Sequence, residues 1–139
     1  MLGRTSQAAL LASLAGVKLL LHLATHHRYG YERDELYFIA CARRLAWGYV
    51  DHPPFVPWLA SLSGEFFDYS LFGLRLFPIA ALTAGLVLTG LMARRLGGGS
   101  FALGLAALSF LISPLYLRLG TFLNVPGFEV FYGSLAAYL

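Results

Sequence analysis

The sequence predicts an all-α transmembrane protein, in which several apolar helices cross a membrane and one long polar loop follows the first of them. Three observations support this fold class: 58% of the 139 residues are hydrophobic, only 12% are charged, and the uncharged residues gather in long runs. A soluble domain is typically about 25% charged and cannot bury so much apolar surface in a small core. The composition therefore excludes a soluble globular enzyme and a disordered chain. The net charge of +3 comes without a dense basic run, so the expected partner is membrane lipid and not nucleic acid.

The first predicted membrane helix covers residues 6–25. At about 1.5 Å per residue it reaches about 30 Å, the hydrocarbon thickness of a bilayer. A cleaved signal peptide is the alternative, but Lys18 interrupts the apolar run and no small-residue cleavage motif precedes the polar loop. Lys18 and His22 share one face of this helix, and both are close enough to its end to extend to the headgroups. Ionisable groups inside a membrane are otherwise functional, so lining a path is the alternative for this pair.

Two further uncharged runs, residues 76–93 and 101–117, predict a helical hairpin that is joined by the arginines at 94–95 and the turn at 97–100. A fourth, partial helix over 129–139 opens with an acid and then offers apolar residues for only about 15 Å. A helix that stopped inside the membrane would leave carbonyl groups unpaired. We therefore expect this 139-residue chain to be the N-terminal part of one larger membrane domain and to be inactive alone.

The positively charged residues predict the orientation of the helices. Arg4 and the pair at 94–95 lie on one side of the membrane, which the positive-inside rule makes cytoplasmic. Arginines in the polar loop argue the other way, but the short hairpin is the stronger determinant. We expect a multi-pass protein of the cell membrane with the polar loop, residues 26–75, on the extracytoplasmic side.

The polar loop concentrates charged and aromatic residues. Within it the sequence predicts an amphipathic helix that stops before Gly48. The acidic pair 34–35 stands at the start of this helix and the arginine pair 43–44 in its last turn, an arrangement that offsets the helix dipole. The surrounding tyrosines and tryptophans indicate that the helix lies at the level of the lipid headgroups.

The segment after this helix presents an acid and a histidine. Asp51 and His52 precede prolines that stiffen the loop and push His52 toward an extended backbone. An ordinary structural reading of the polar residues remains open: Asp34 is then a helix N-cap, the arginine pair complements the dipole, and Asp51 is a turn residue.

Residues 31–37, YERDELY, and residues 45–54, LAWGYVDHPP, together resemble the first extracytoplasmic loop of glycosyltransferase family 39. This family contains GT-C enzymes related to protein O-mannosyltransferases and to the aminoarabinose transferase of lipid A. The order of helices is similar over essentially the whole chain, which implies a GT-C-like helical bundle. The resemblance also implies an enzyme that moves a sugar from a polyprenyl-phosphate carrier to an acceptor hydroxyl, on a protein, lipid or glycan, with inversion at the anomeric carbon.

The resemblance implies roles for single residues. Asp34 matches the family's catalytic aspartate, the general base, and Glu35 beside it is the second catalytic candidate. Asp51 falls where relatives have an acid linked to a metal or polar network, and Glu129 falls near a third acidic position. These two are therefore the candidate ligands of a divalent metal ion. His52 falls where some relatives have a cation that faces the carrier phosphate.

Departure of the carrier phosphate requires positive charge nearby. The candidates that bind the substrate in this way are Arg33, Arg43, Arg44 and His52, or else a divalent ion, and the sequence does not choose among them. A different class of protein is the alternative: a small non-enzymatic membrane scaffold or transporter subunit, whose polar loop docks a partner.

Overall fold

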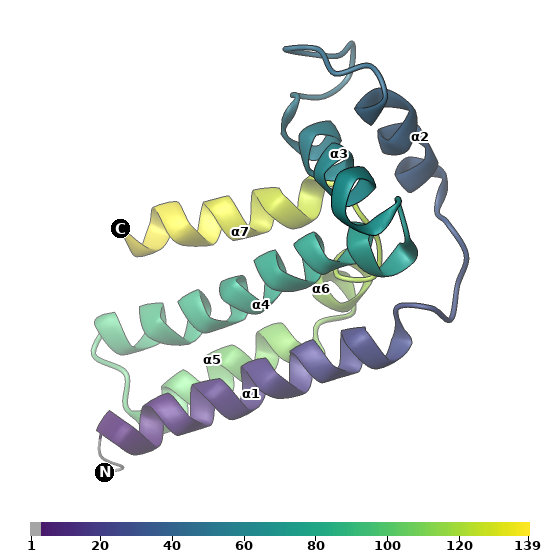
Figure 1. Cartoon of the computed structure of the whole chain (residues 1–139). Helices are drawn as coiled ribbons and strands as arrows, with labels where there is room; N and C mark the ends of the chain where they lie inside the picture. The colour runs from purple at the N-terminus through teal and green to yellow at the C-terminus, as the bar shows by residue number, and fades with distance from the viewer. Residues whose placement is uncertain (1–3) are drawn as a thin grey trace.

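The structure is a computed structural model that describes residues 4–139, over which it contains seven helices and no strand. The helices are α1 (Arg4–Thr25), α2 (Arg33–Ala42), α3 (Phe55–Phe67), α4 (Leu71–Arg95), α5 (Ser100–Ile112), α6 (Pro114–Leu119) and α7 (Val125–Tyr138). The helices α1, α4, α5 and α7 run side by side as rods, and the shorter α2 and α3 cover one end of them (Figure 1). The all-helical prediction is confirmed.

Helix α4 is the centre of the bundle, because it packs against α1, α3, α5 and α7. Two clusters of buried apolar side chains surround it. One cluster faces α1 and α5 and includes Leu86 and Phe110. The other faces α2, α3 and α7 and includes Leu74 and Phe128. Burial of these side chains fixes the covering helices α2 and α3 to the end of the rods.

Two of the helices are long and apolar enough to cross a membrane. They cover Thr5–Thr25 and Leu71–Arg95. The helices predicted over 6–25 and 76–93 are therefore present, and the second starts five residues earlier than predicted. Helix α5 is also apolar but contains only 13 residues.

The third predicted helix, residues 101–117, is two helices. Helix α5 ends at Ile112 and α6 begins at Pro114, while Ser113 between them is extended, with φ −61° and ψ 120°. Proline favours an extended residue before it and has no N–H for the helical ladder. The prediction of one continuous helix was wrong because it overlooked this proline.

Two ionisable side chains of α1 bind the short helix α6. The Lys18 Nζ donates to the carbonyl oxygen of Tyr116 at 3.4 Å, and the His22 Nε2 lies 3.2 Å from the carbonyl oxygen of Leu117. Both side chains are buried. The prediction that they extend to the headgroups was wrong. They contact carbonyl groups near the end of a short helix, and such carbonyl groups have no hydrogen-bond donor within the helix.

Gly120, which ends α6, faces the His22 ring so closely that a Cβ atom there would lie 2.3 Å from His22 Nε2. We expect Gly120→Ala to lower the free energy of unfolding by about 1–3 kcal/mol, because contacts to two carbonyl oxygens hold the ring in place. Thermal unfolding in detergent measures this loss. Gly16→Ala in α1 is the matched control, since nothing lies within 4 Å of a Cβ there. Equal losses in the two variants would contradict the explanation.

The polar end of the molecule differs from the prediction of one long loop over 26–75. Residues 55–67 form α3: Pro54 stands at the N-cap position, and Pro57 falls in the first turn, where proline is tolerated. The hydroxyl of Ser70 accepts a hydrogen bond from the backbone N–H of Gly73 and caps α4. The loop therefore contains a second helix and ends at residue 70.

Helix α2 is shorter than predicted, because it ends at Ala42. The Tyr49 hydroxyl lies 3.1 Å from the carbonyl oxygen of Cys41, to which it donates, and 3.2 Å from the backbone nitrogen of Ala46, from which it accepts. These contacts take the place of a further helical turn. The arginine pair 43–44 consequently follows the helix and does not occupy its last turn.

Candidate functional site

A buried ion pair joins the start of α2 to α4. The Arg75 Nη2 lies 2.8 Å from Glu35 Oε2, and the Arg75 Nε lies 2.9 Å from Glu35 Oε1. Glu35 is 0% exposed and Arg75 is 2% exposed. This two-point geometry is the strongest that arginine and a carboxylate form, and burial shields it from water.

The same two side chains also hold three backbone segments. Arg75 donates to the carbonyl oxygens of His26, Tyr29 and Gly30, which belong to the link between α1 and α2. Glu35 accepts from the backbone N–H groups of Glu32 and Leu123. All the oxygens of the Glu35 carboxylate are therefore occupied where no substrate can reach them. Glu35 therefore holds the start of α2 in place, and Asp34 stays the candidate for a general base.

Asp34 is the open carboxylate on the first turn of α2. Its side chain is 49% exposed, and its ionic contact is with Arg33, whose Nε lies 3.6 Å away and whose side chain is 94% exposed. An exposed pair of this kind is weak and is easily separated. Asp34 therefore keeps oxygen lone pairs that can accept a proton.

A polar pocket of about 270 Å³ lies beside the start of α2. It is lined by His22, Thr25, His26, Arg28, Tyr29, Glu32, Arg75, Arg118, Gly120 and Thr121. Glu32 and Arg118 form an ion pair across it, with Arg118 Nη2 2.7 Å from Glu32 Oε1. The hydrogen bond from Arg118 is the main cause that lowers the pKa of Glu32, so Glu32 is a poorer base than a free glutamate. Sequence reasoning missed this pocket, because Arg118 comes from the far end of the chain.

Asp51 contacts α2 through Tyr37. The Tyr37 hydroxyl donates to Asp51 Oδ1 at 2.8 Å, and Tyr37 lies three residues after Asp34 on the helix. Residues three apart are neighbours on a helix surface, with about 5–6 Å between Cβ atoms. Asp51 therefore contacts a residue one turn along α2 from Asp34.

His52 lies among aromatic rings. Its side chain is 5% exposed, it stacks on the Tyr49 ring with 4.8 Å between centroids, and it meets the rings of Tyr37 and Phe38 edge-on. Its Nε2 is buried without a hydrogen-bond partner and lies 3.7 Å from Asp51 Oδ1. A side chain enclosed in this way supports the loop, and a carrier phosphate reaches it only if the rings move.

The hydrogen bond to Asp51 raises the pKa of Tyr37 to about 12. The protonated phenol is the form that the folded protein stabilises, so this contribution to stability is present below about pH 10 and is lost as the pH rises through about 12. We expect Asp51→Asn to return one tyrosine toward its ordinary titration, measured by tyrosinate absorbance. Asp68→Asn is the control. Identical titration curves for the wild type and Asp51→Asn would contradict the effect of the Asp51 hydrogen bond on Tyr37.

The remaining predicted site residues are spread over the surface. Arg43 is exposed, with its guanidinium carbon 5.6 Å from the centre of the Tyr69 ring, and Arg44 and Glu129 are also exposed. Over residues 4–139 no three His, Cys, Asp or Glu side chains are grouped so that they could hold a metal ion. The predicted ligands Asp51 and Glu129 therefore lack a third protein partner in the part of the chain that the structure describes.

The fold and the site define an all-helical protein with two helices long and apolar enough to cross a membrane, and with acidic and basic side chains at one end of its helices. Residues 51–139 match the family described as dolichyl-phosphate-mannose-protein mannosyltransferase. The chain belongs to this family, which makes it a membrane glycosyltransferase of the mannosyltransferase type. This membership confirms the predicted relation to GT-C glycosyltransferases and argues against a non-enzymatic scaffold or transporter subunit.

The matched residues cover less of the chain than the predicted resemblance. They begin at Asp51, so Asp34 and the rest of α2 lie outside them. No curated protein and no solved structure matches the chain. The role of Asp34 as a general base therefore depends on its geometry and on the resemblance of residues 31–37 to glycosyltransferase family 39.

Proposed function

We propose that this protein is a multi-pass GT-C glycosyltransferase that moves a sugar from a polyprenyl-phosphate carrier to an acceptor hydroxyl, with inversion at the anomeric carbon. One observation carries the proposal: of the three carboxylates at the start of α2, Glu32 is paired with Arg118, Glu35 is buried on Arg75, and Asp34 is left open. An open carboxylate is what a general base needs.

The membrane determines where the two substrates meet. The prenyl tail of the carrier stays in hydrocarbon, so its sugar-phosphate is met at the interface, where α2 covers the ends of the rods (Figure 1). Asp34 accepts the proton of the acceptor hydroxyl while its oxygen attacks the anomeric carbon. The bond from that carbon to the phosphate oxygen breaks, and the carrier phosphate leaves with the electron pair.

Positive charge must lie close to the leaving phosphate. Arg118 and Arg28 line the polar pocket beside α2, and Arg33 is exposed next to Asp34. We assign the charge to these arginines ahead of Arg43, Arg44 and His52, because Arg43 and Arg44 follow the far end of α2 and His52 is enclosed.

The proposed enzyme lies in the cell membrane with residues 26–70 on the extracytoplasmic side. Arg94 and Arg95 end α4 at the opposite end of the rods and are expected on the cytoplasmic side. This orientation places Asp34 outside the cytoplasm, where nucleotide sugars are scarce and lipid-linked donors are the accessible source.

A donor comparison tests the proposed function. The complete protein in proteoliposomes is given either mannosyl phosphoryl polyprenol with a β linkage or the nucleotide sugar, together with peptide, lipid or glycan acceptors. We expect transfer from the lipid-linked donor alone and an α-linked product, read by nuclear magnetic resonance. Transfer from the nucleotide sugar at an equal rate, or a β-linked product, would contradict the proposal.

A further inference from the structure

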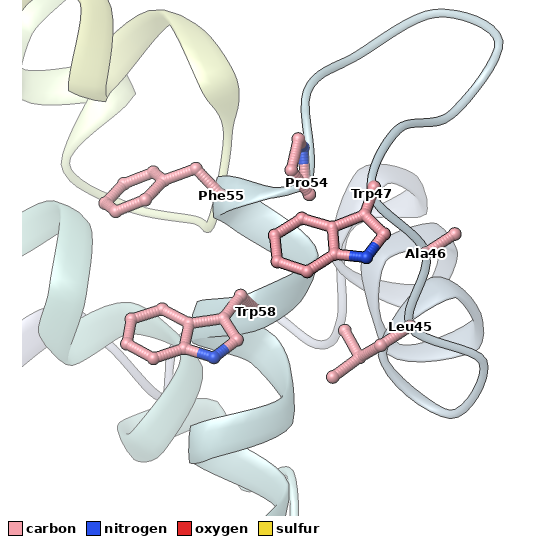
Figure 2. A pocket seen from close by; sticks show the side chains of 6 residues that line it. All are labelled: Leu45, Ala46, Trp47, Pro54, Phe55 and Trp58. Atoms are coloured by element: carbon pink, nitrogen blue, oxygen red, sulfur yellow. The ribbon is translucent and has the colours of Figure 1, made fainter.

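An apolar groove of about 520 Å³ lies beyond the far end of α2. Its lining residues are Leu45, Ala46, Trp47, Pro54, Phe55 and Trp58. The indole of Trp47 extends from the loop after α2 toward α3, which carries the Phe55 and Trp58 rings (Figure 2). About 12 Å of helix separates Asp34 from Ala42, so the groove is separate from the candidate active site.

The apolar side chains around the groove are unusually exposed. Trp47 is 97% exposed and Val50 is fully exposed, while Leu45 and Trp58 are about half exposed. A contiguous exposed apolar surface marks a place of interaction, and tryptophan is enriched where a membrane meets water.

The groove lies at the polar end of the long helices (Figure 1). Helix α1 ends at Thr25 and α4 begins at Leu71 on the same end of the rods, and α3 packs directly on α4 (Figure 1). In the proposed membrane orientation, lipid molecules of one leaflet surround this part of the protein.

Positive charge stands directly beside the groove. Arg43 and Arg44 precede Leu45 and are exposed. Among residues 4–139 the Arg44 side chain has no hydrogen bond or ion pair. The Arg43 side chain makes only a cation–π contact with the Tyr69 ring. Asp51, the one acid of the same loop, accepts a hydrogen bond from the Tyr37 hydroxyl. Two arginines against one aspartate leave this segment with a positive charge that favours an anionic ligand.

We propose that this groove binds an anionic phospholipid of the surrounding membrane. An acyl chain lies between Trp47 and Trp58, and the phosphate-bearing headgroup contacts Arg43 and Arg44. The site is independent of the proposed sugar transfer, because it lies apart from Asp34 and uses none of the groups assigned to catalysis. It fixes the loop between α2 and α3 to the membrane surface.

The tryptophans make this proposal directly measurable, because the 139-residue chain contains two and both line the groove. The chain is placed in nanodiscs at one copy per disc, with brominated acyl chains on either phosphatidylglycerol or phosphatidylcholine. We expect brominated phosphatidylglycerol to quench the fluorescence more strongly at equal mole fraction, both in the wild type and in the single-tryptophan variant Trp58→Phe.

Matched arginine variants identify the headgroup site. Arg43→Gln with Arg44→Gln should reduce the preference for phosphatidylglycerol by about fivefold for each arginine removed. Arg94→Gln with Arg95→Gln, at the opposite end of α4, should leave it unchanged. Equal quenching by both lipids would overturn the proposal. Displacement of phosphatidylglycerol by traces of polyprenyl phosphate would overturn it too, since the groove would then belong to the sugar donor.

Discussion

Replacement of Asp34 by asparagine is expected to lower the rate of sugar transfer by about 10²- to 10⁴-fold, the usual contribution of a general base. Asparagine keeps the size of the side chain but cannot accept a proton from the acceptor hydroxyl. Asp34 is half exposed and contacts the exposed Arg33, so the change breaks no buried interaction. We expect the loss to fall on kcat and not on KM, because the base acts in the transition state.

The control for this variant is Glu65→Gln, the same change from carboxylate to amide at an exposed position of α3. Transfer by the control should equal that of the wild type, and thermal unfolding of both variants should be close to wild type. Near-normal turnover by Asp34→Asn would remove Asp34 from the role of base. A large fall in its unfolding temperature would show instead that the carboxylate is structural.

Loss of Arg75 is expected to cause the largest fall in stability of any single substitution at the polar end. Arg75→Met leaves the Glu35 carboxylate buried without its partner and removes the donor to the carbonyl oxygens of His26 and Gly30. Breaking a buried ion pair on one side typically costs about 3–5 kcal/mol. Unfolding by heat or denaturant in detergent measures the change, and transfer should fall with it because the start of α2 loses its support.

Arg118→Met is the matched control, since it removes an arginine from an exposed pair with Glu32. Its effect on stability should be much smaller, because water screens exposed charges. The double variant Glu35→Gln with Arg75→Met should recover part of the loss, as the uncompensated charge is gone. Equal losses for Arg75→Met and Arg118→Met would contradict the buried role of the Arg75 pair.

The long helices could be predicted from the sequence because hydropathy indicates them, although it placed the start of α4 five residues late. The runs that became α1 and α4 carry almost no charge over lengths that match a bilayer. The interruption at Pro114 was equally visible in the sequence, since proline cannot continue a helical ladder. The short helix α3 was harder to recognise: its prolines resemble a stiff loop, and only their position at the helix start makes them compatible with a helix.

The contacts at the polar end could not be predicted, because they join residues that are distant in sequence. Arg75 binds Glu35 across 40 positions, and Arg118 binds Glu32 across 86. No local pattern indicates that the neighbouring acids Asp34 and Glu35 have opposite surroundings, one open and one buried. The end of α2 likewise depends on Tyr49, which folds back onto the helix.

Chemical rescue of Asp34→Ala tests most directly whether a carboxylate at this position activates the acceptor. The rate of sugar transfer by the complete protein is measured while formate is added as a substitute base. We expect almost no transfer without formate and a rate that rises with formate concentration, while Arg75→Met shows no such rise. Transfer by Asp34→Ala at the wild-type rate without formate would contradict this expectation.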